Sequence, residues 1–88
     1  MGHVPLDQLN DQIESAKMVV VVGGKYAHYK DSKKLYTVTD LLIIESTDEV
    51  GVMYRPADAP VSFVRPLHEW LQQVEYLGKK VPRFTHVQ

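Results

Sequence analysis

Short runs rich in β-branched and aromatic residues, separated by turn residues, constrain the fold of this chain more than any other feature. They begin at four consecutive valines and continue to near the end of the sequence. Valine, isoleucine, threonine and tyrosine favour strands, whereas clusters of Gly, Pro, Asp and Ser favour turns. The predicted strands are residues 19–22, 26–30, 35–45, 51–55, 62–65, 74–77 and 81–84, and the predicted turns include residues 31–34, 46–49 and 56–60.

These runs predict a mainly β fold of five or six short antiparallel strands after the valine run. A small sheet must close or be covered, because unpaired edges invite pairing with other chains. We therefore expect a meander or a partly open barrel or roll. A short helical turn is expected between Pro66 and Leu71.

The longest run, residues 35–45, alternates in a way that predicts one buried face. Tyr36, Val38 and Leu42 are expected on that face, because alternate residues of a strand share a side. Residues 41–44 are apolar on both sides, which indicates a central strand or a β-bulge.

An amphipathic helix precedes the strands. Its apolar residues recur at three- and four-residue spacing, at Leu6, Leu9, Ile13 and Ala16. We expect a helix over residues 5–18, with Pro5 in its first turn, where a missing N–H costs nothing. Residues 1–22 then form an N-terminal helix and short strand, packed on or swapped with a barrel domain at residues 23–88.

Composition limits the classes of protein that the chain can belong to. Its 88 residues are 44% hydrophobic and 24% charged, which suits one small globular domain and excludes a multi-domain enzyme. Cysteine is absent, so disulfides, thiolate nucleophiles and cysteine zinc sites are excluded. No apolar run spans a bilayer and the N-terminus lacks signal-peptide features, so we expect a cytoplasmic protein without a membrane partner.

The net charge of −1 predicts no general electrostatic attraction to nucleic acid or to anionic membranes. The charge is unevenly placed, however. Residues 23–34 and 61–88 carry an excess of basic side chains, and residues 35–60 carry an excess of acidic ones. This distribution allows a local basic face, and opposite charges meeting across strands are the alternative.

Motifs of known chemistry are incomplete in this chain. Gly24 and Lys25 lack the spacing of a phosphate-binding loop, since Val19 stands where its first glycine belongs. His68 and Glu69 begin the zinc-protease pattern, but Gln72 replaces its second histidine. We therefore predict no catalytic residues, no metal and no cofactor, and a small enzyme with an unrecognised active site stays an alternative.

A mixture of aromatic and basic residues gives the candidate site. The mixture comprises Tyr26, His28, Tyr29, Lys30, Tyr54, Arg55, Arg65, Trp70, Arg83 and Phe84. Within it, we expect a partly exposed ligand-binding pocket or groove lined by Tyr26, His28, Tyr29, Lys30, Tyr54, Arg65 and Trp70. Core packing of the rings, and pairing of Arg65 with Glu69 or Glu75, are the alternatives.

Several of these residues also belong to signatures that resemble a known family. His28-Tyr29-Lys30, Val64-Arg65-Pro66 and Pro82-Arg83-Phe84, in this order and spacing, resemble the DUF1653 family of small bacterial proteins along about three quarters of the chain. The resemblance implies a compact roll related to SH3-type barrels and no established activity. The chain departs from the family pattern in two places. Residues 31–34 stand where the family has a glycine, which suggests a longer hairpin, and the N-terminal helix lies outside the shared region.

Three classes of function follow from these observations. A non-catalytic binding or protein-interaction module ranks first, because small rolls bind peptides or nucleic acids through exposed aromatic residues and loops. An enzyme ranks second, and a structural accessory subunit ranks third. The N-terminal helix and the run from Val19 to Val22 are also expected to support a homodimer, because an unpaired valine strand is a template for pairing.

Overall fold

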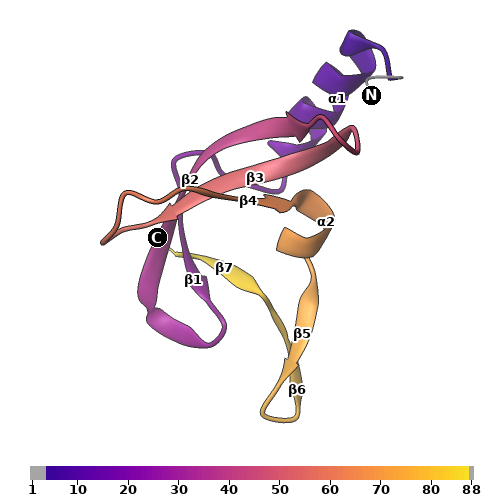
Figure 1. Ribbon diagram of the computed structural model, residues 1–88. Helices are drawn as coiled ribbons and strands as arrows, with labels where there is room; N and C mark the ends of the chain where they lie inside the picture. The colour runs from indigo at the N-terminus through magenta and orange to yellow at the C-terminus, as the bar shows by residue number, and fades with distance from the viewer. Residues whose placement is uncertain (1–3, 88) are drawn as a thin grey trace.

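Seven strands in two antiparallel sheets and two helices make up residues 4–87, the part of the chain that this computed structural model describes (Figure 1). In chain order they are α1 (Leu6–Ala16), β1 (Lys25–His28), β2 (Asp31–Ile44), β3 (Glu49–Pro56), β4 (Phe63–Pro66), α2 (Leu67–Trp70), β5 (Gln73–Tyr76), β6 (Lys79–Pro82) and β7 (Phe84–Val87).

The larger sheet has the strand order β4-β3-β2-β1-β7, and β5 and β6 form a separate hairpin. The larger sheet curls without closing into a barrel, and the ring of Phe84 on the edge strand β7 lies 5.5 Å from that of Tyr54 on β3. Figure 1 shows α1 beside the β2–β3 end of the molecule, with the β1–β2 and β5–β6 hairpins projecting at the other end. The predicted mainly β fold, with an N-terminal helix and a short helical turn at α2, is confirmed.

A bulge in β2 shifts the alternation of its side chains. Pairing with β3 changes register between Val38 and Asp40, so Thr39 is an extra residue. Val38 and Leu41 are both buried, whereas Leu42 is only partly buried. The prediction that Leu42 continues the buried face is therefore wrong, since one inserted residue moves every later side chain to the opposite side.

The strand predicted at residues 19–22 does not form. The segment continues α1 as turns, with the N–H of Val20 donating to the carbonyl of Ala16 at 2.9 Å. Val20 is thereby placed in the core, and the N–H of Val21 donates to the hydroxyl of Tyr26 at 2.9 Å. Burial of one valine against the sheet overrides the general preference of valine for strands.

Two further differences from the sequence prediction concern the connections between strands. The expected turn at residues 31–34 is the start of β2, and the connection from β1 is a tight turn at residues 29–30. The expected strand at residues 81–84 is divided at Arg83 into β6 and β7. The chain bends there because it leaves the β5–β6 hairpin and joins the larger sheet beside β1.

The core lies between the concave side of the sheet, α2 and the end of α1. Its buried members are Ala16, Val20, Tyr26, Val38, Leu41, Val50, Val52, Tyr54, Trp70 and Phe84. At its centre the rings of Trp70 and Phe84 stack at 3.8 Å, and this contact joins α2 to β7. Neither helix within residues 4–87 is long and apolar enough to cross a membrane.

Candidate ligand-binding clefts

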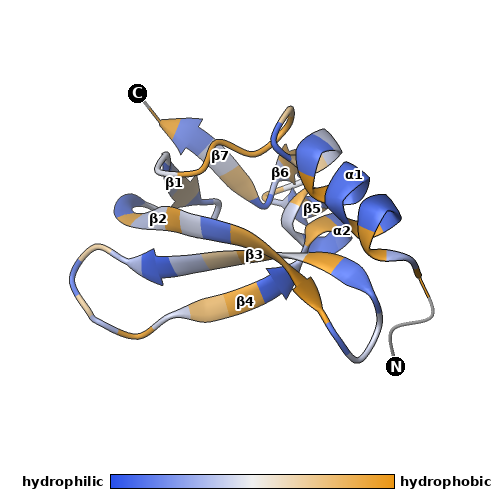
Figure 2. Cartoon of the chain, turned by 90° about the horizontal axis from the view of Figure 1, so that it is seen from above, coloured by the Kyte–Doolittle hydropathy of each residue, from blue (hydrophilic) through white to orange (hydrophobic). Residues whose placement is uncertain are grey.

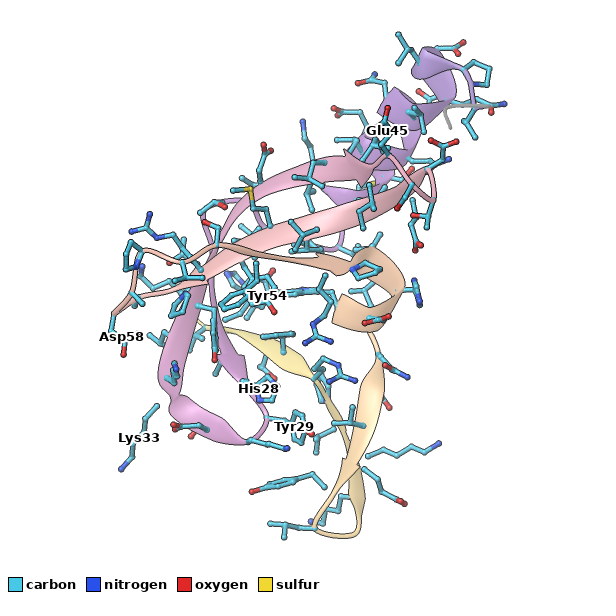
Figure 3. All side chains as sticks on the ribbon, in the orientation of Figure 1. His28, Tyr29, Lys33, Glu45, Tyr54 and Asp58 are labelled. Carbon is cyan, nitrogen blue, oxygen red and sulfur yellow. The ribbon has the colours of Figure 1, made fainter. Side chains whose placement is uncertain are left out.

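Two clefts of similar size share His28 as a lining residue. The first, which we call the Arg65 cleft, measures about 290 Å³ and is lined by His28, Tyr36, Tyr54, Phe63, Arg65 and Phe84. The second, the Tyr76 cleft, measures about 300 Å³ and is lined by Ala27, His28, Tyr29, Ser32, Tyr76, Val81, Pro82 and Thr85. Figure 3 shows Tyr54 below β3, with His28 and then Tyr29 following toward the β5–β6 hairpin.

The curl of the larger sheet forms the Arg65 cleft. Tyr36 comes from β2, Tyr54 from β3, Phe63 from β4 and Phe84 from β7. Phe63 and Arg65 face the same way, because they are alternate residues of β4. Ring centroids of Tyr36 and Tyr54 lie 5.7 Å apart and those of Tyr54 and Phe63 lie 5.8 Å apart, so the walls are aromatic surfaces in mutual contact.

Arg65 is the cation that lines this cleft. Its guanidinium carbon lies 5.9 Å from the centre of the Phe84 ring, and its side chain is 28% exposed. The nearest acid is Glu69, one helical turn on, at 3.5 Å, which is longer than the 2.7–2.9 Å typical of a strong charge-assisted hydrogen bond. This loose pair leaves much of the hydrogen-bonding capacity of the guanidinium free.

Arg83 is a second cation held close to the clefts. Its N–H donates to the carbonyl of Gln72 at 3.0 Å, and its own carbonyl accepts from the N–H of Tyr29 at 3.0 Å. Its guanidinium donates to the side-chain oxygen of Gln72 at 3.1 Å. These bonds fix Arg83 between the β5–β6 hairpin and the β1–β2 turn, so its charge has a defined place.

Within residues 4–87, two buried side-chain nitrogen atoms lack a hydrogen-bond partner, and they are Nε of Arg65 and Nε of Arg83. Leaving a buried donor unpaired costs about 1–3 kcal/mol, more for a charged group. Buried unsatisfied groups are rare in folded proteins, and a functional role is one of the explanations for them. That both belong to arginines beside the same clefts identifies this region as the candidate site.

The electrostatic potential at His28 is positive. Partial burial lowers the pKa of His28, and the charges of Arg83, Arg65 and Lys30 lower it further. Nδ1 of His28 accepts the N–H of Lys30 at 3.2 Å, so the neutral ring carries its proton on Nε2. An uncharged ring among three cations leaves that positive charge available to an anion.

The Tyr76 cleft lies between the β1–β2 turn and the β5–β6 hairpin. The rings of Tyr29 and Tyr76 meet edge to face at 5.3 Å, and the rings of His28 and Tyr29 lie 4.6 Å apart. Nζ of Lys30 lies 5.9 Å from the centre of the Tyr29 ring. A row of three rings with a cation at its edge therefore leads away from the Arg65 cleft.

The structure divides the predicted site residues into two groups. His28, Arg65 and the core residue Tyr54, which is only 7% exposed, line the Arg65 cleft, and Tyr29 lines the Tyr76 cleft with exposed Lys30 beside it. Tyr26 and Trp70 are buried core residues that line a separate cavity behind Phe84. The pairing of Arg65 with Glu69, which was an alternative from the sequence, is present and coexists with the cleft.

Tyr36, Phe63 and Tyr76 line the clefts although sequence reasoning did not select them. Tyr36 and Tyr76 stand in predicted strands, where alternation alone leaves open which face is covered. Phe63 lies two residues before Arg65, and that spacing was the available signal that both share a face. The pairing of distant strands brings all three to the clefts, and no local pattern encodes it.

A larger cavity of about 470 Å³ lies elsewhere, between α1, β3 and α2. Its lining includes Asp11, Glu49 and His68, and Nδ1 of His68 lies 3.2 Å from Glu49. None of the sequence-predicted site residues lines it, and Asp11 and His68 are exposed. Within residues 4–87, no three His, Asp or Glu side chains gather closely enough to hold a metal ion.

Comparisons with known proteins identify the family of this chain. The model of a family described as a protein of unknown function, DUF1653, matches residues 24–86. The chain belongs to the DUF1653 family. A crystal structure of a DUF1653 protein from Bordetella bronchiseptica is similar to it, with 32% sequence identity and a TM-score of 0.64, over 74% of this chain and 85% of that chain. A comparison with curated proteins gives no significant match.

The DUF1653 match contains both clefts and leaves out α1. His28, Arg65 and Arg83 all lie within residues 24–86, as do the aromatic residues that line the two clefts. The helix and the turns that follow it are an addition of this chain to the part that the DUF1653 model matches. The candidate site therefore belongs to the matched region.

Proposed function

We propose that this DUF1653 protein is a non-catalytic binding module whose Arg65 cleft takes a ligand with a flat ring and an anionic group. The observation that carries the proposal is the state of Arg65, with a buried unpaired Nε and one loose ion pair. A guanidinium of this kind binds carboxylates or phosphates through two parallel hydrogen bonds. We also propose a cytoplasmic location, which suits a chain without cysteine.

The walls of the Arg65 cleft suit the ring of such a ligand. Phe63 is 46% exposed, and Tyr36 and His28 are partly buried, so each offers accessible aromatic surface. Aromatic surfaces stack on flat rings, and a neutral His28 can donate from Nε2 to a polar atom. Arg65 and the rings would thus hold the two ends of one small molecule.

The composition of the lining favours binding over catalysis. The Arg65 cleft is lined by one arginine, one histidine and four phenylalanine or tyrosine rings. Nucleophilic catalysis pairs a nucleophile with a base that a third group orients. This lining supplies a histidine without a serine, threonine or carboxylate partner.

Titration of ¹⁵N-labelled protein with phenyl phosphate tests the proposal, because this probe combines a ring with an anion. Amide shifts are expected at His28, Arg65 and Phe84. Arg65→Gln should weaken binding about 10- to 100-fold, since a hydrogen bond to a charged group contributes about 1.5–3 kcal/mol.

Arg55→Gln is the matched control, because Arg55 is an exposed arginine on the neighbouring strand β3 that lines neither cleft. It removes the same charge and should leave phenyl phosphate binding nearly unchanged. Equal losses in the two variants would reduce the effect to net charge and overturn the assignment to the Arg65 cleft. Absence of shifts at millimolar phenyl phosphate would overturn the proposed function.

A further inference from the structure

We propose that the two clefts together bind single-stranded nucleic acid, with bases against the aromatic walls and phosphates along the cations near His28. This inference rests on the proposed function, because it extends the ligand of the Arg65 cleft to a chain. The first observation is proximity: the two clefts have similar volumes, about 290 and 300 Å³, and His28 lines both of them. A ligand made of repeating units of similar size can occupy both.

Accessible rings lie in each cleft. Phe63 of the Arg65 cleft is 46% exposed and Tyr76 of the Tyr76 cleft is 37% exposed. His28 and Tyr29 lie between them, with ring centroids 4.6 Å apart. Proteins that bind single strands without reading sequence place successive bases on aromatic side chains in this way. A duplex would not suit the clefts, because its bases already stack on each other.

The cations lie where the backbone of such a strand would pass. Arg65, Arg83 and Lys30 come from β4, the β6–β7 bend and the β1–β2 turn, and all three charges act on His28. No acidic residue lines either cleft. The acids near the clefts include Glu69, which pairs loosely with Arg65, exposed Glu75 on β5, and exposed Asp31, which lies opposite His28 in the β1–β2 pairing.

Acidic and basic side chains are concentrated at opposite ends of the molecule, with the basic side chains near the clefts. Figure 3 shows Glu45 at the α1 end of the sheet, and Lys33 at the opposite end beside the hairpin that carries His28 and Tyr29. The helix α1 adds Asp7, Asp11 and Glu14 to the acidic end. A net charge near zero therefore hides a basic end, which a polyanion would prefer.

Nucleic acid fits these observations better than an acidic peptide does. Carboxylates of a peptide would meet the cations, but they would leave the exposed faces of Phe63 and Tyr76 without a planar partner. A nucleotide chain alternates flat bases with single negative charges, and this alternation matches rings interleaved with Arg65, Arg83 and Lys30.

Affinity measured against ligand length tests the inference. Uridine 5′-monophosphate and the tetranucleotides of uridine and of thymidine are titrated into the full chain by fluorescence and NMR. The tetranucleotides should bind about tenfold or more tighter than the mononucleotide, because further bases gain stacking. Their log affinity should fall with log salt by about 0.7 per phosphate contacted, hence a slope of about −2 for three contacts.

Tyr76→Ala should lower the ratio of tetranucleotide to mononucleotide affinity toward one. Leu77→Ala is the matched control, because Leu77 is the exposed neighbour of Tyr76 at the hairpin turn and lines neither cleft. It should leave that ratio unchanged.

Three outcomes would overturn the inference. Equal affinity for mononucleotide and tetranucleotide would do so and would leave the proposed function intact if phenyl phosphate binds. A tetraglutamate peptide that binds as tightly as the tetranucleotides would point to an acidic protein partner instead. Failure of phenyl phosphate and of every nucleotide to bind at millimolar concentration would overturn both proposals.

Discussion

Phe84 is the residue at which the core and the candidate site meet. One contact of its ring is the stack on Trp70 at 3.8 Å, which belongs to the core. Its other contacts include the His28 ring at 5.2 Å and the guanidinium of Arg65 at 5.9 Å, both in the Arg65 cleft. A rigid ring fixed from the core side thus sets the positions of the two polar side chains.

The first prediction at the residue scale concerns the titration of His28. Arg83→Gln should raise the pKa of His28 toward its ordinary value of 6.5, because one of the charges that lower it is removed. Arg65, Lys30 and the partial burial of the ring remain, so the recovery should be incomplete. The ring ¹³C–¹H resonances of His28 report the pKa directly across a pH titration.

Arg55→Gln serves again as the control, since Arg55 is not among the charges that act on His28. Saturating phenyl phosphate should raise the pKa of His28 as well, because a bound anion offsets the cations. A pKa that stays fixed in Arg83→Gln would contradict the electrostatic picture of the site.

The lowered pKa of His28 also sets the sign of a stability effect. Between the ordinary value of 6.5 and the lower folded value, the unfolded chain binds more protons than the folded chain does. The contribution of His28 to stability is therefore complete above pH 6.5 and declines as the pH falls through this window.

At the scale of single residues, sequence reasoning could find the chemistry but not the exposure. The aromatic and basic mixture was recognisable from residue type alone. Tyr26 and Trp70 are buried in the core, whereas Tyr29 and His28 remain partly accessible. Period-two alternation divides the residues of a strand into two faces, and only the packing of other elements decides which face is covered.

At the scale of elements, strands were predictable where local and tertiary preferences agree. The runs that became β2 and β3 are long and rich in β-branched residues, and both were recognised. The strand predicted for the valine run at 19–22 does not form, because this segment continues α1 as turns. The boundary between β6 and β7 was not predicted, because the amino-acid composition does not indicate that the chain changes its partner strand at Arg83.

A matched pair of valines tests how firmly the segment after α1 is attached. Val20 is 1% exposed in the core, and Val22 is 45% exposed two residues later. Val20→Ala should lower the free energy of unfolding by about 1–2 kcal/mol, since two methyl groups leave the core and a cavity remains. Val22→Ala should change it by less than about 0.5 kcal/mol.

Urea unfolding followed by tryptophan fluorescence measures both variants, because Trp70 lies in the same core cluster as Val20. Equal small effects would mean that residues 1–22 are only loosely joined to the rest.

At the scale of the whole molecule, the basic clefts and the exposed apolar surface lie on different parts of the chain. The region that the DUF1653 model matches, residues 24–86, carries the basic clefts. The segment before it carries acidic side chains on α1 and a run of exposed apolar residues. Figure 2 shows this run between α1 and β1 as hydrophobic over most of its length. Such a patch is a common feature of interfaces between subunits.

Self-association through this segment is the last prediction. The exposed apolar residues of this segment are Met18, Val19, Val21 and Val22. They form no strand, so the strand pairing expected from the sequence cannot hold a dimer together. Burial of apolar area, at about 25 cal/mol per Å², would then be the main driving force for a homodimer. Sedimentation at micromolar concentrations should show a dimer, and Met18→Glu should dissociate it because a charge would enter the contact. Leu77→Glu is the matched control, since Met18 and Leu77 are both 85% exposed and Leu77 lies at the β5–β6 turn. A wild-type monomer across this range, or equal dissociation by Leu77→Glu, would refute the prediction.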